Sequence, residues 1–236
     1  MRLDTIKAVS FDLDDTLYDN RPIIKIAEFE FYQFLLTHFP KSKQWQQSDW
    51  IALKQTLITL EPELAHDPTK ARTATLSHGL NVLGYKEKEL TLGVKKAMDC
   101  FNHYRSDFEI DNDVIEMLTQ WAKNVPLIGI TNGNVNASKI GLNGIFKFVL
   151  SAGNGINMKP MPDMFELASR KLKLKPSQIL HVGDSWQSDV QGARLAGFQS
   201  AWLNPSFGNN QKMNREKGLL PHIELSHLFD LNSVIQ

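Results

Sequence analysis

Five short, almost continuously apolar runs constrain the fold of this chain more than any other feature. Such runs lack the alternation of a half-exposed strand and are typical of parallel strands covered by helices on both faces. Helical patterns separate the last four runs. Strands that alternate with helices predict an α/β fold with a doubly wound, mostly parallel sheet. The predicted strands are Ala8 to Phe11, Leu127 to Ile130, Phe148 to Leu150, Ile179 to Val182 and Ser200 to Leu203.

The helices between these strands carry recognisable ends. Asp111 is suited to cap a helix that runs to about Asn124. Pro162 is suited to the first turn of a helix that continues through Lys171. A third helix is predicted from about Trp186 to Ala196, where Gly197 is placed to end it.

The stretch between the first two strands shows no strand pattern. Four amphipathic helices are predicted there, and helices of this length can bury a core of their own as a small bundle. We therefore predict a helical domain, residues 20–108, inserted into an α/β core formed by residues 1–19 and 109–236. The four helices are expected from Pro22, over Ser48 to Leu60, from Asp67-Pro68 to Gly84, and from about Lys86 to Arg105.

Clustered carboxylates follow two of the predicted strands. The first strand runs into Asp12 and Asp14, and the strand that ends at Val182 is followed by Asp184 and Asp189. Neighbouring carboxylates repel one another and must be hydrated, protonated or bound to a cation. Ligands of open α/β sheets bind beyond the carboxyl ends of the strands. Two acidic clusters at that edge predict a site for a hard cation, and oxygen ligands suit Mg²⁺.

Phosphate-binding groups are expected at the same edge. Thr131 and Asn132 follow the strand that ends at Ile130, and they offer a hydroxyl donor and amide groups. Lys159 follows the next strand and could neutralise a transferring phosphoryl group. Each of these signals is weak alone, because Asp-x-Asp, Thr-Asn-Gly and Lys-Pro all occur often by chance. Their joint order along the chain carries the prediction.

This order resembles the haloacid dehalogenase superfamily, specifically its phosphatase branch with a helical-bundle cap. Four stretches match its motifs, and the resemblance covers the whole chain. It implies that Asp12 attacks phosphorus and that Asp14 donates a proton to the leaving alcohol and then activates water. The matching stretches are FDLDDTL from Phe11, ITNG from Ile130, Lys159-Pro160, and VGDSWQSD from Val182.

The same resemblance implies a ligand set. Mg²⁺ would take the Asp12 carboxylate, the Asp14 backbone carbonyl and the Asp184 carboxylate, with Asp189 as an outer-shell or weaker ligand. Thr131, the backbone after it, and Lys159 would hold the phosphoryl oxygens. True dehalogenases of the superfamily lack the acid at position 14, so its presence favours phosphate chemistry.

Within this branch the chain looks like bacterial phosphatases that act on 5-amino-6-(5-phospho-D-ribitylamino)uracil, a riboflavin precursor, and on FMN. The expected partner is thus a small phosphorylated metabolite. Other phosphatases of the superfamily, acting on phosphoglycolate or sugar phosphates, and phosphomutases are the nearest alternatives. A receiver-type signalling module also uses an aspartyl phosphate, but it usually lacks a large helical insertion after the first strand.

Composition excludes several other classes. Lys+Arg and Asp+Glu both total 26, so no global basic field for nucleic acid or anionic membrane is expected. No apolar stretch approaches the length of a membrane span. The single cysteine, Cys100, permits no internal disulfide, and the N-terminus does not resemble a signal peptide. A cytoplasmic protein is therefore expected, and no pattern indicates its oligomeric state.

Several polar or aromatic residues invite a functional reading but are better explained structurally. Trp186 is expected to pack at a helix start, His181 to be a satisfied core histidine, and Arg72 and His66 to be solvated. The basic residues Lys212, Arg215 and Lys217 are expected in a solvated loop.

Overall fold

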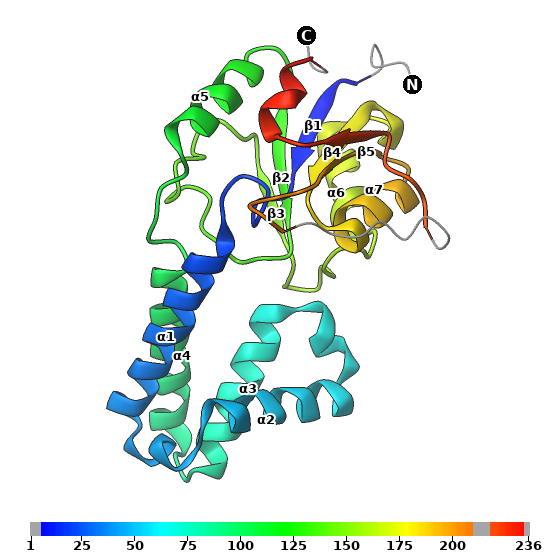
Figure 1. Cartoon of the computed structure of the whole chain (residues 1–236). Helices are drawn as coiled ribbons and strands as arrows, with labels where there is room; N and C mark the ends of the chain where they lie inside the picture. The colour runs from blue at the N-terminus through cyan, green and yellow to red at the C-terminus, as the bar shows by residue number, and fades with distance from the viewer. Residues whose placement is uncertain (1–5, 210–217, 234–236) are drawn as a thin grey trace. The chain divides into compact units, whose positions relative to one another are not determined.

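The computed structural model describes residues 6–209 and 218–233, and it divides into two compact units. One, called here the α/β unit, comprises residues 1–20, 109–133 and 137–236. The other, called the helical unit, comprises residues 21–108 with 134–136. Figure 1 shows both units, and each has its own hydrophobic core.

A six-stranded sheet forms the centre of the α/β unit, in the order β3-β2-β1-β4-β5-β6. All five neighbouring pairs are parallel, which confirms the doubly wound α/β prediction. The strand order reverses direction between β1 and β4, the place where such sheets bind ligands. The strands are β1 (Ala8–Phe11), β2 (Leu127–Thr131), β3 (Val149–Ser151), β4 (Ile179–Gly183), β5 (Gln199–Leu203) and β6 (Ile223–Leu225).

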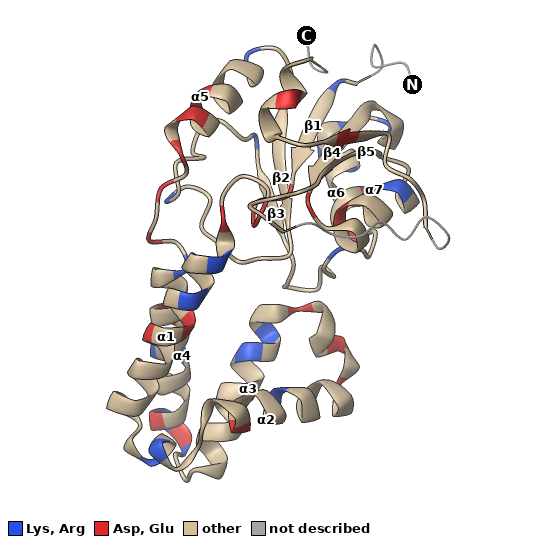
Figure 2. Cartoon of the chain, in the orientation of Figure 1, with Lys and Arg blue, Asp and Glu red and all other residues tan. Residues whose placement is uncertain are grey.

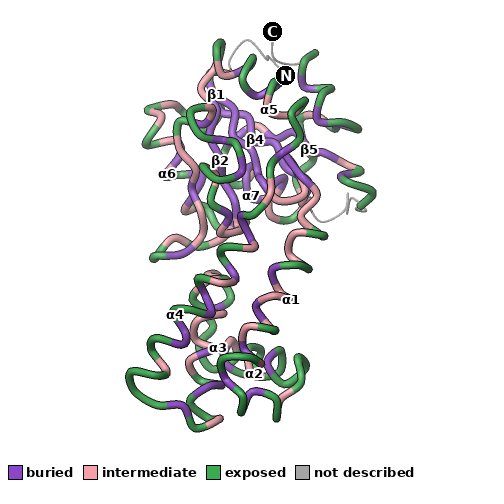
Figure 3. Tube along the Cα trace, turned by 90° about the vertical axis from the view of Figure 1, so that its left-hand side faces the viewer, coloured by how far each residue is buried: buried purple, intermediate pink, exposed green. Residues whose placement is uncertain are grey.

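Helices cover both faces of this sheet, so its central strands are buried throughout (Figures 1 and 3). On one face Trp121 of α5 (Asn112–Trp121) stacks on Phe11 of β1, with ring centroids 6.0 Å apart. On the other face Phe165 of α6 (Asp163–Leu172) packs edge-on against His181 of β4 and against Phe198. Burial on both faces explains why the strands read as continuous apolar runs.

The structure corrects the predicted elements at three places. It adds the short strand β6, whose three residues follow a polar segment and gave no pattern of their own. The single helix predicted from Trp186 is instead a π-helical turn, Trp186–Gln191, followed by α7 (Gly192–Leu195). As predicted, Asp111 caps α5, accepting a hydrogen bond from the backbone N–H of Asp113, and Gly197 has a left-handed φ of +82°. Pro162 lies one residue before α6 rather than inside it.

The helical unit consists of α1 (Asn20–His38), α2 (Gln47–Leu60), α3 (Pro68–Val82) and α4 (Glu87–Tyr104), with two 3₁₀ turns, η2 (Pro40–Gln44) and η3 (Pro62–His66). Residues of all four α-helices share one apolar cluster, in which Phe31 of α1 meets Phe101 of α4 edge-on. Gly79 of α3 lies under the ring of Trp50, where a Cβ would overlap that ring. Large apolar side chains converging from four helices give this unit a core of its own.

One structural expectation for the helical unit was wrong. Arg72 is half-buried and paired rather than freely solvated: its guanidinium donates to both carboxylate oxygens of Glu28, at 2.7 and 3.1 Å. It also lies over the Phe101 ring, 3.7 Å from the centroid. Arg72 and Glu28 are 44 residues apart in the sequence, so no local pattern indicated this pairing.

Acidic and basic residues are mixed along α4, whereas on α1 the basic Arg21 and Lys25 precede the acidic Glu28 and Glu30 (Figure 2). No helix among residues 6–209 and 218–233 is long and apolar enough to cross a membrane. The expected loop cations Lys212, Arg215 and Lys217 lie outside the described residues.

Candidate active site

The turn after β1 carries the first pair of predicted acids. Asp12 continues the strand, because its backbone N–H donates to the Val182 carbonyl of β4 at 2.8 Å. Its side chain is 12 % exposed. Asp14 lies in the following turn, where its carboxylate accepts a hydrogen bond from the Tyr18 hydroxyl at 2.6 Å. The Asp12 and Asp14 side chains therefore have different environments, although both follow the same strand.

The loop after β4 brings the second pair of acids to the first. Oxygen atoms of Asp12, Asp184 and Asp189 lie within 4.8 Å of one another, and all three residues are buried. Asp184 follows β4 directly, and its Oδ1 lies 3.4 Å from the Thr16 hydroxyl. Asp189 comes from the π-helical turn, and Asp14 is absent from this group of carboxylates among the described residues.

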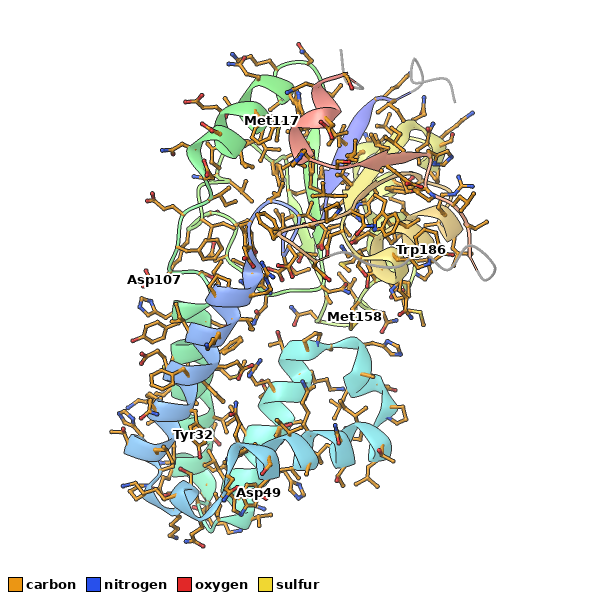
Figure 4. The ribbon with its side chains drawn as sticks, in the orientation of Figure 1. Tyr32, Asp49, Asp107, Met117, Met158 and Trp186 are labelled. Carbon is orange, nitrogen blue, oxygen red and sulfur yellow. The ribbon has the colours of Figure 1, made fainter. Side chains whose placement is uncertain are left out.

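Lys159 joins these carboxylates from the loop after β3. Its Nζ lies 2.9 Å from Asp12 Oδ1 and 2.7 Å from Asp189 Oδ1, and it donates to the Ile130 carbonyl at 2.6 Å. The side chain is 1 % exposed, so this ammonium is shared by two buried carboxylates. Met158, labelled in Figure 4, precedes it in the same loop.

The predicted phosphate ligands after β2 also have defined contacts. The buried Thr131 hydroxyl oxygen accepts a hydrogen bond from the Gly133 N–H at 3.0 Å. The Asn132 side chain donates to the Lys159 carbonyl at 3.0 Å and accepts from the Lys159 N–H at 2.7 Å. The Asn132 side chain thus fixes the backbone of Lys159. Asn132 would therefore contact a phosphate through its backbone N–H.

Residues 6–197 match the haloacid dehalogenase-like hydrolase family. The chain belongs to this family. It is 39% identical over 233 residues to an Escherichia coli protein, 5-amino-6-(5-phospho-D-ribitylamino)uracil phosphatase YigB, covering 99% of this chain and 98% of YigB. It is also 39% identical over 218 residues to (S)-2-haloacid dehalogenase 2 of a Pseudomonas species, covering 85% of each.

A solved structure is similar over nearly the whole chain. It is a 2-haloacid dehalogenase from Pseudomonas syringae, with a TM-score of 0.89 and 32% identity over 97% of both chains. The family match confirms the expected superfamily and shows that the chain is a hydrolase. The named relatives include both a phosphatase and dehalogenases, so the residues of the site must distinguish the two chemistries.

The electrostatics of the hydrolase site are dominated by buried negative charge. Burial raises the pKa of Asp12 to about 7, with the charges of Asp189 and Asp14 adding to this rise against the opposing Lys159 ammonium. Burial and the neighbouring carboxylates of Asp189 and Asp12 raise the pKa of Asp184 to about 8. Both carboxyl groups therefore resist ionisation unless positive charge is added beside them.

Asp189 behaves differently from the other two acids. Its Oδ1 accepts from Lys159 and from His181, and its Oδ2 accepts from the Ser185 N–H at 2.9 Å. The Lys159 charge and these hydrogen bonds outweigh burial and lower the pKa of Asp189 to about 2. Protein groups already satisfy this carboxylate, whereas Asp12 Oδ1 has its ion pair with Lys159 but no hydrogen bond within the described part of the chain.

These residues fit a divalent cation in the family's manner. Asp12 and Asp184 offer carboxylate oxygens that lie close together, are short of positive charge, and belong to the ligand type that Mg²⁺ prefers. Both oxygens of Asp189 already accept hydrogen bonds from protein groups, so Asp189 suits an outer-shell position that supports the metal ligands.

Two contacts of this site were not anticipated. His181 is buried as expected of a core residue, but its Nε2 lies 3.1 Å from Asp189 Oδ1 and its Nδ1 lies 2.9 Å from the Ser10 hydroxyl. Burial lowers the pKa of His181, against the opposing hydrogen bond to Asp189. The sequence did carry one signal, since Ser10 and His181 are polar residues within two apolar strands. The structure pairs these two residues in register between β1 and β4.

Trp186 packs as expected rather than lying free. Its ring meets Trp202 of β5 edge-on, with centroids 5.2 Å apart. The indole N–H of Trp202 donates to the Asp184 carbonyl at 2.7 Å. The aromatic pair therefore supports the loop that carries Asp184.

Proposed function

We propose that this protein is a Mg²⁺-dependent phosphatase that hydrolyses small phosphomonoesters through a phosphoaspartyl intermediate on Asp12. The observation that carries the proposal is the grouping of Asp12, Asp184 and Lys159 at the point where the sheet reverses its strand order. A nucleophilic carboxylate, a buried cation and a candidate metal site together meet the needs of phosphoryl transfer. The named phosphatase relative supports the same reaction class.

In the proposed reaction Asp12 attacks phosphorus in line with the leaving alcohol. Asp14 donates the proton that the alcohol requires, and its hydrogen bond from Tyr18 orients the carboxyl group for this transfer. Water then attacks the phosphoaspartate, and Asp14 accepts the proton from that water. Inorganic phosphate leaves and Asp12 is regenerated.

The remaining residues bind and orient. Thr131, the backbone N–H groups after it, and the Lys159 ammonium would hold the phosphoryl oxygens. The Asp12 and Asp184 carboxylates and the Asp14 carbonyl would hold Mg²⁺, with Asp189 behind them. Bound there, the ion would neutralise charge on the phosphoryl group and favour the ionised form of Asp12.

We assign residues 1–19 and 109–236 to the catalytic core and residues 20–108 to a helical cap that excludes water during the reaction. A cap of this size suits a small metabolite. The proposed substrates are 5-amino-6-(5-phospho-D-ribitylamino)uracil and FMN, since the likeness to YigB extends over 99% of the chain. Phosphoglycolate, sugar phosphates and a phosphomutase reaction are the alternatives in the same chemistry.

Dehalogenation is the second candidate, because two of the similar proteins are named dehalogenases. Asp14 distinguishes the reactions. A departing halide needs no proton, whereas a departing alkoxide does, and Asp14 supplies a carboxyl group where that proton is required.

The deciding experiment measures phosphate release from a panel of phosphorylated metabolites and halide release from a 2-haloacid. The panel contains the ribitylaminouracil phosphate, FMN, phosphoglycolate and a sugar phosphate. We expect phosphate release that EDTA abolishes and Mg²⁺ restores, fastest with the first two compounds. Halide release without phosphate release would replace the proposal by dehalogenation, and phosphatase activity that resists chelation would remove the metal from it.

A further inference from the structure

The polar residues buried beneath the site form a continuous chain of contacts. From Ser10 the chain passes to His181 at 2.9 Å, to Asp189 at 3.1 Å, to Lys159 at 2.7 Å and to Asp12 at 2.9 Å. All five side chains are buried, four of them almost completely. Polar groups in such surroundings are costly unless each has a partner, so their geometry is strongly determined.

The ring of His181 has one arrangement that fits both of its neighbours. Nε2 faces a carboxylate oxygen and must carry a hydrogen to avoid repulsion. The same oxygen already accepts from the Lys159 ammonium, which makes a second cation beside it unfavourable. A neutral ring with hydrogen on Nε2 leaves Nδ1 as an acceptor for the Ser10 hydroxyl.

The backbone leaves Asp189 few other positions. Its Oδ2 is held by the Ser185 N–H, and its side chain occupies the space beside Gly183. His181 then fixes the rotation of the carboxylate by donating to Oδ1, the oxygen that holds Lys159. Without that donor the carboxylate could turn. Lys159 would keep its bond to the Ile130 carbonyl but lose the Asp189 oxygen that helps to set the position of its ammonium beside Asp12.

We propose that His181, oriented by Ser10, is a positioning residue that holds the Asp189 carboxylate and thereby keeps the Lys159 ammonium against Asp12. This inference deepens the proposed function and rests on it for its catalytic consequence. In this role His181 is more than a core histidine with satisfied hydrogen bonds, because its ring influences the position of the Lys159 ammonium beside Asp12. The hydrogen-bonding partners of the His181 ring are Ser10 and Asp189, so its effect on Lys159 and Asp12 passes through Asp189.

A matched pair of amide substitutions separates this role from simple core packing. In His181→Gln the amide nitrogen can reach the position of Nε2 and still donate to Asp189. In His181→Asn the shorter side chain can meet Ser10 but cannot reach Asp189. We expect kcat for p-nitrophenyl phosphate with Mg²⁺ to fall on the order of 10- to 100-fold in His181→Asn, with KM little changed. His181→Gln should restore most of that loss.

A second readout does not depend on activity. The ¹⁵N–¹H signal of the Lys159 ammonium in metal-free protein should shift or broaden in His181→Asn and stay near its original position in His181→Gln. The imidazole ¹⁵N spectrum of the unaltered protein should show a neutral His181 with hydrogen on Nε2. Ser10→Ala, which opens little space, should change the Nδ1 signal even if the His181 variants fold poorly.

His222→Asn is the control for loss of a histidine from the same unit, since His222 is exposed and contacts Arg194 and Ser200 rather than the site. Equal losses of kcat in His181→Asn and His181→Gln would overturn the proposal, as would an unchanged Lys159 signal in His181→Asn. If the unaltered protein released no phosphate, the proposed function would fail. The two spectroscopic results would still decide whether His181 positions Asp189 and Lys159.

Discussion

The Asp189 carboxylate occupies the space that a Cβ on Gly183 would fill. Gly183 ends β4, directly before Asp184, so the close approach lies at the centre of the site. Only glycine lets the backbone of β4 come this near to Asp189. This contact explains why a residue without a side chain separates the strand from the acid that follows it.

Gly183→Ala should therefore displace Asp189 and, through it, Lys159. We expect kcat to fall on the order of 100-fold, because shifts near 1 Å in such groups have effects of this size. Gly144→Asn is the control: its φ of +77° tolerates Asn, and no atoms lie near a Cβ there. Phosphate release and thermal unfolding of both variants are the measurements. Full activity in Gly183→Ala would contradict the assigned role of Asp189.

Asp12→Asn should abolish turnover without loss of the fold. The amide cannot form the phosphoaspartate. The substitution should not destabilise the fold, because the buried surroundings already oppose ionisation of the Asp12 carboxyl group and the amide carries no charge. In the absence of metal, its free energy of unfolding should equal or exceed that of the unaltered protein at pH 8. Calorimetry and phosphate release test both parts, and retained turnover would refute the nucleophile assignment.

Lys159→Met should destabilise the protein strongly. The substitution leaves the low-pKa carboxylate of Asp189 without its ammonium partner in a buried site. Removing one member of a buried ion pair costs about 3–5 kcal/mol. Lys70→Met is the matched control, since Lys70 and Glu63 form a 4.0 Å pair at the surface and such pairs contribute about 0–1 kcal/mol. Denaturant unfolding in both variants gives the comparison, and equal small effects would contradict the buried pairing.

The affinity for Mg²⁺ should rise with pH between about 6 and 8. In the metal-free protein the pKa of Asp12 is about 7 and that of Asp184 about 8, so binding of the cation must release protons in this range. Titration calorimetry in buffers of different ionisation enthalpy measures this release. A pH-independent affinity with no proton release would argue against these two carboxylates as ligands.

The same raised pKa values make the metal-free protein less stable as pH rises. Between the ordinary carboxyl pKa of 3.8 and about 8, the folded state binds more protons at these two groups than the unfolded state does. Their contribution to the free energy of unfolding therefore falls across that window. Saturating Mg²⁺ should remove this slope, because the bound ion would keep both carboxyl groups ionised in the folded state, as they are in the unfolded state above pH 6. Thermal unfolding at pH 6, 7 and 8, with and without Mg²⁺, measures the change.

Arg72→Lys should weaken the helical unit. Lysine cannot reproduce the two-fold hydrogen bonding to Glu28 or the planar contact with the Phe101 ring. We expect a loss of about 1–2 kcal/mol in the stability of this unit. Denaturant unfolding with Arg170→Lys as a control measures it, because Arg170 is an exposed residue of α6. No difference between the two variants would show that the Glu28 contact contributes little.

The strands β1 to β5, and the side chains that follow them, can be predicted from the amino-acid sequence alone. Burial on both faces makes each strand a continuous apolar run, so the transition to Asp12, Thr131 and Asp184 is visible locally. The helices of the inserted segment could be predicted from a different local pattern, because their apolar residues repeat at helical spacing. The short strand β6 and the π-helical turn were missed, because neither has a periodic pattern long enough to detect.

Which of these groups come into contact depends on long-range packing and could not be predicted from local patterns. The order of strands places β1 between β2 and β4, and this order depends on packing between segments more than a hundred residues apart. From the sequence, Asp189 was expected as an outer-shell or weaker metal ligand. Its contacts with Lys159, His181 and Ser185 arise from the bend of the chain after β4, which depends on the close approach at Gly183. Local pattern identifies the chemical groups, whereas long-range packing sets the distances between them.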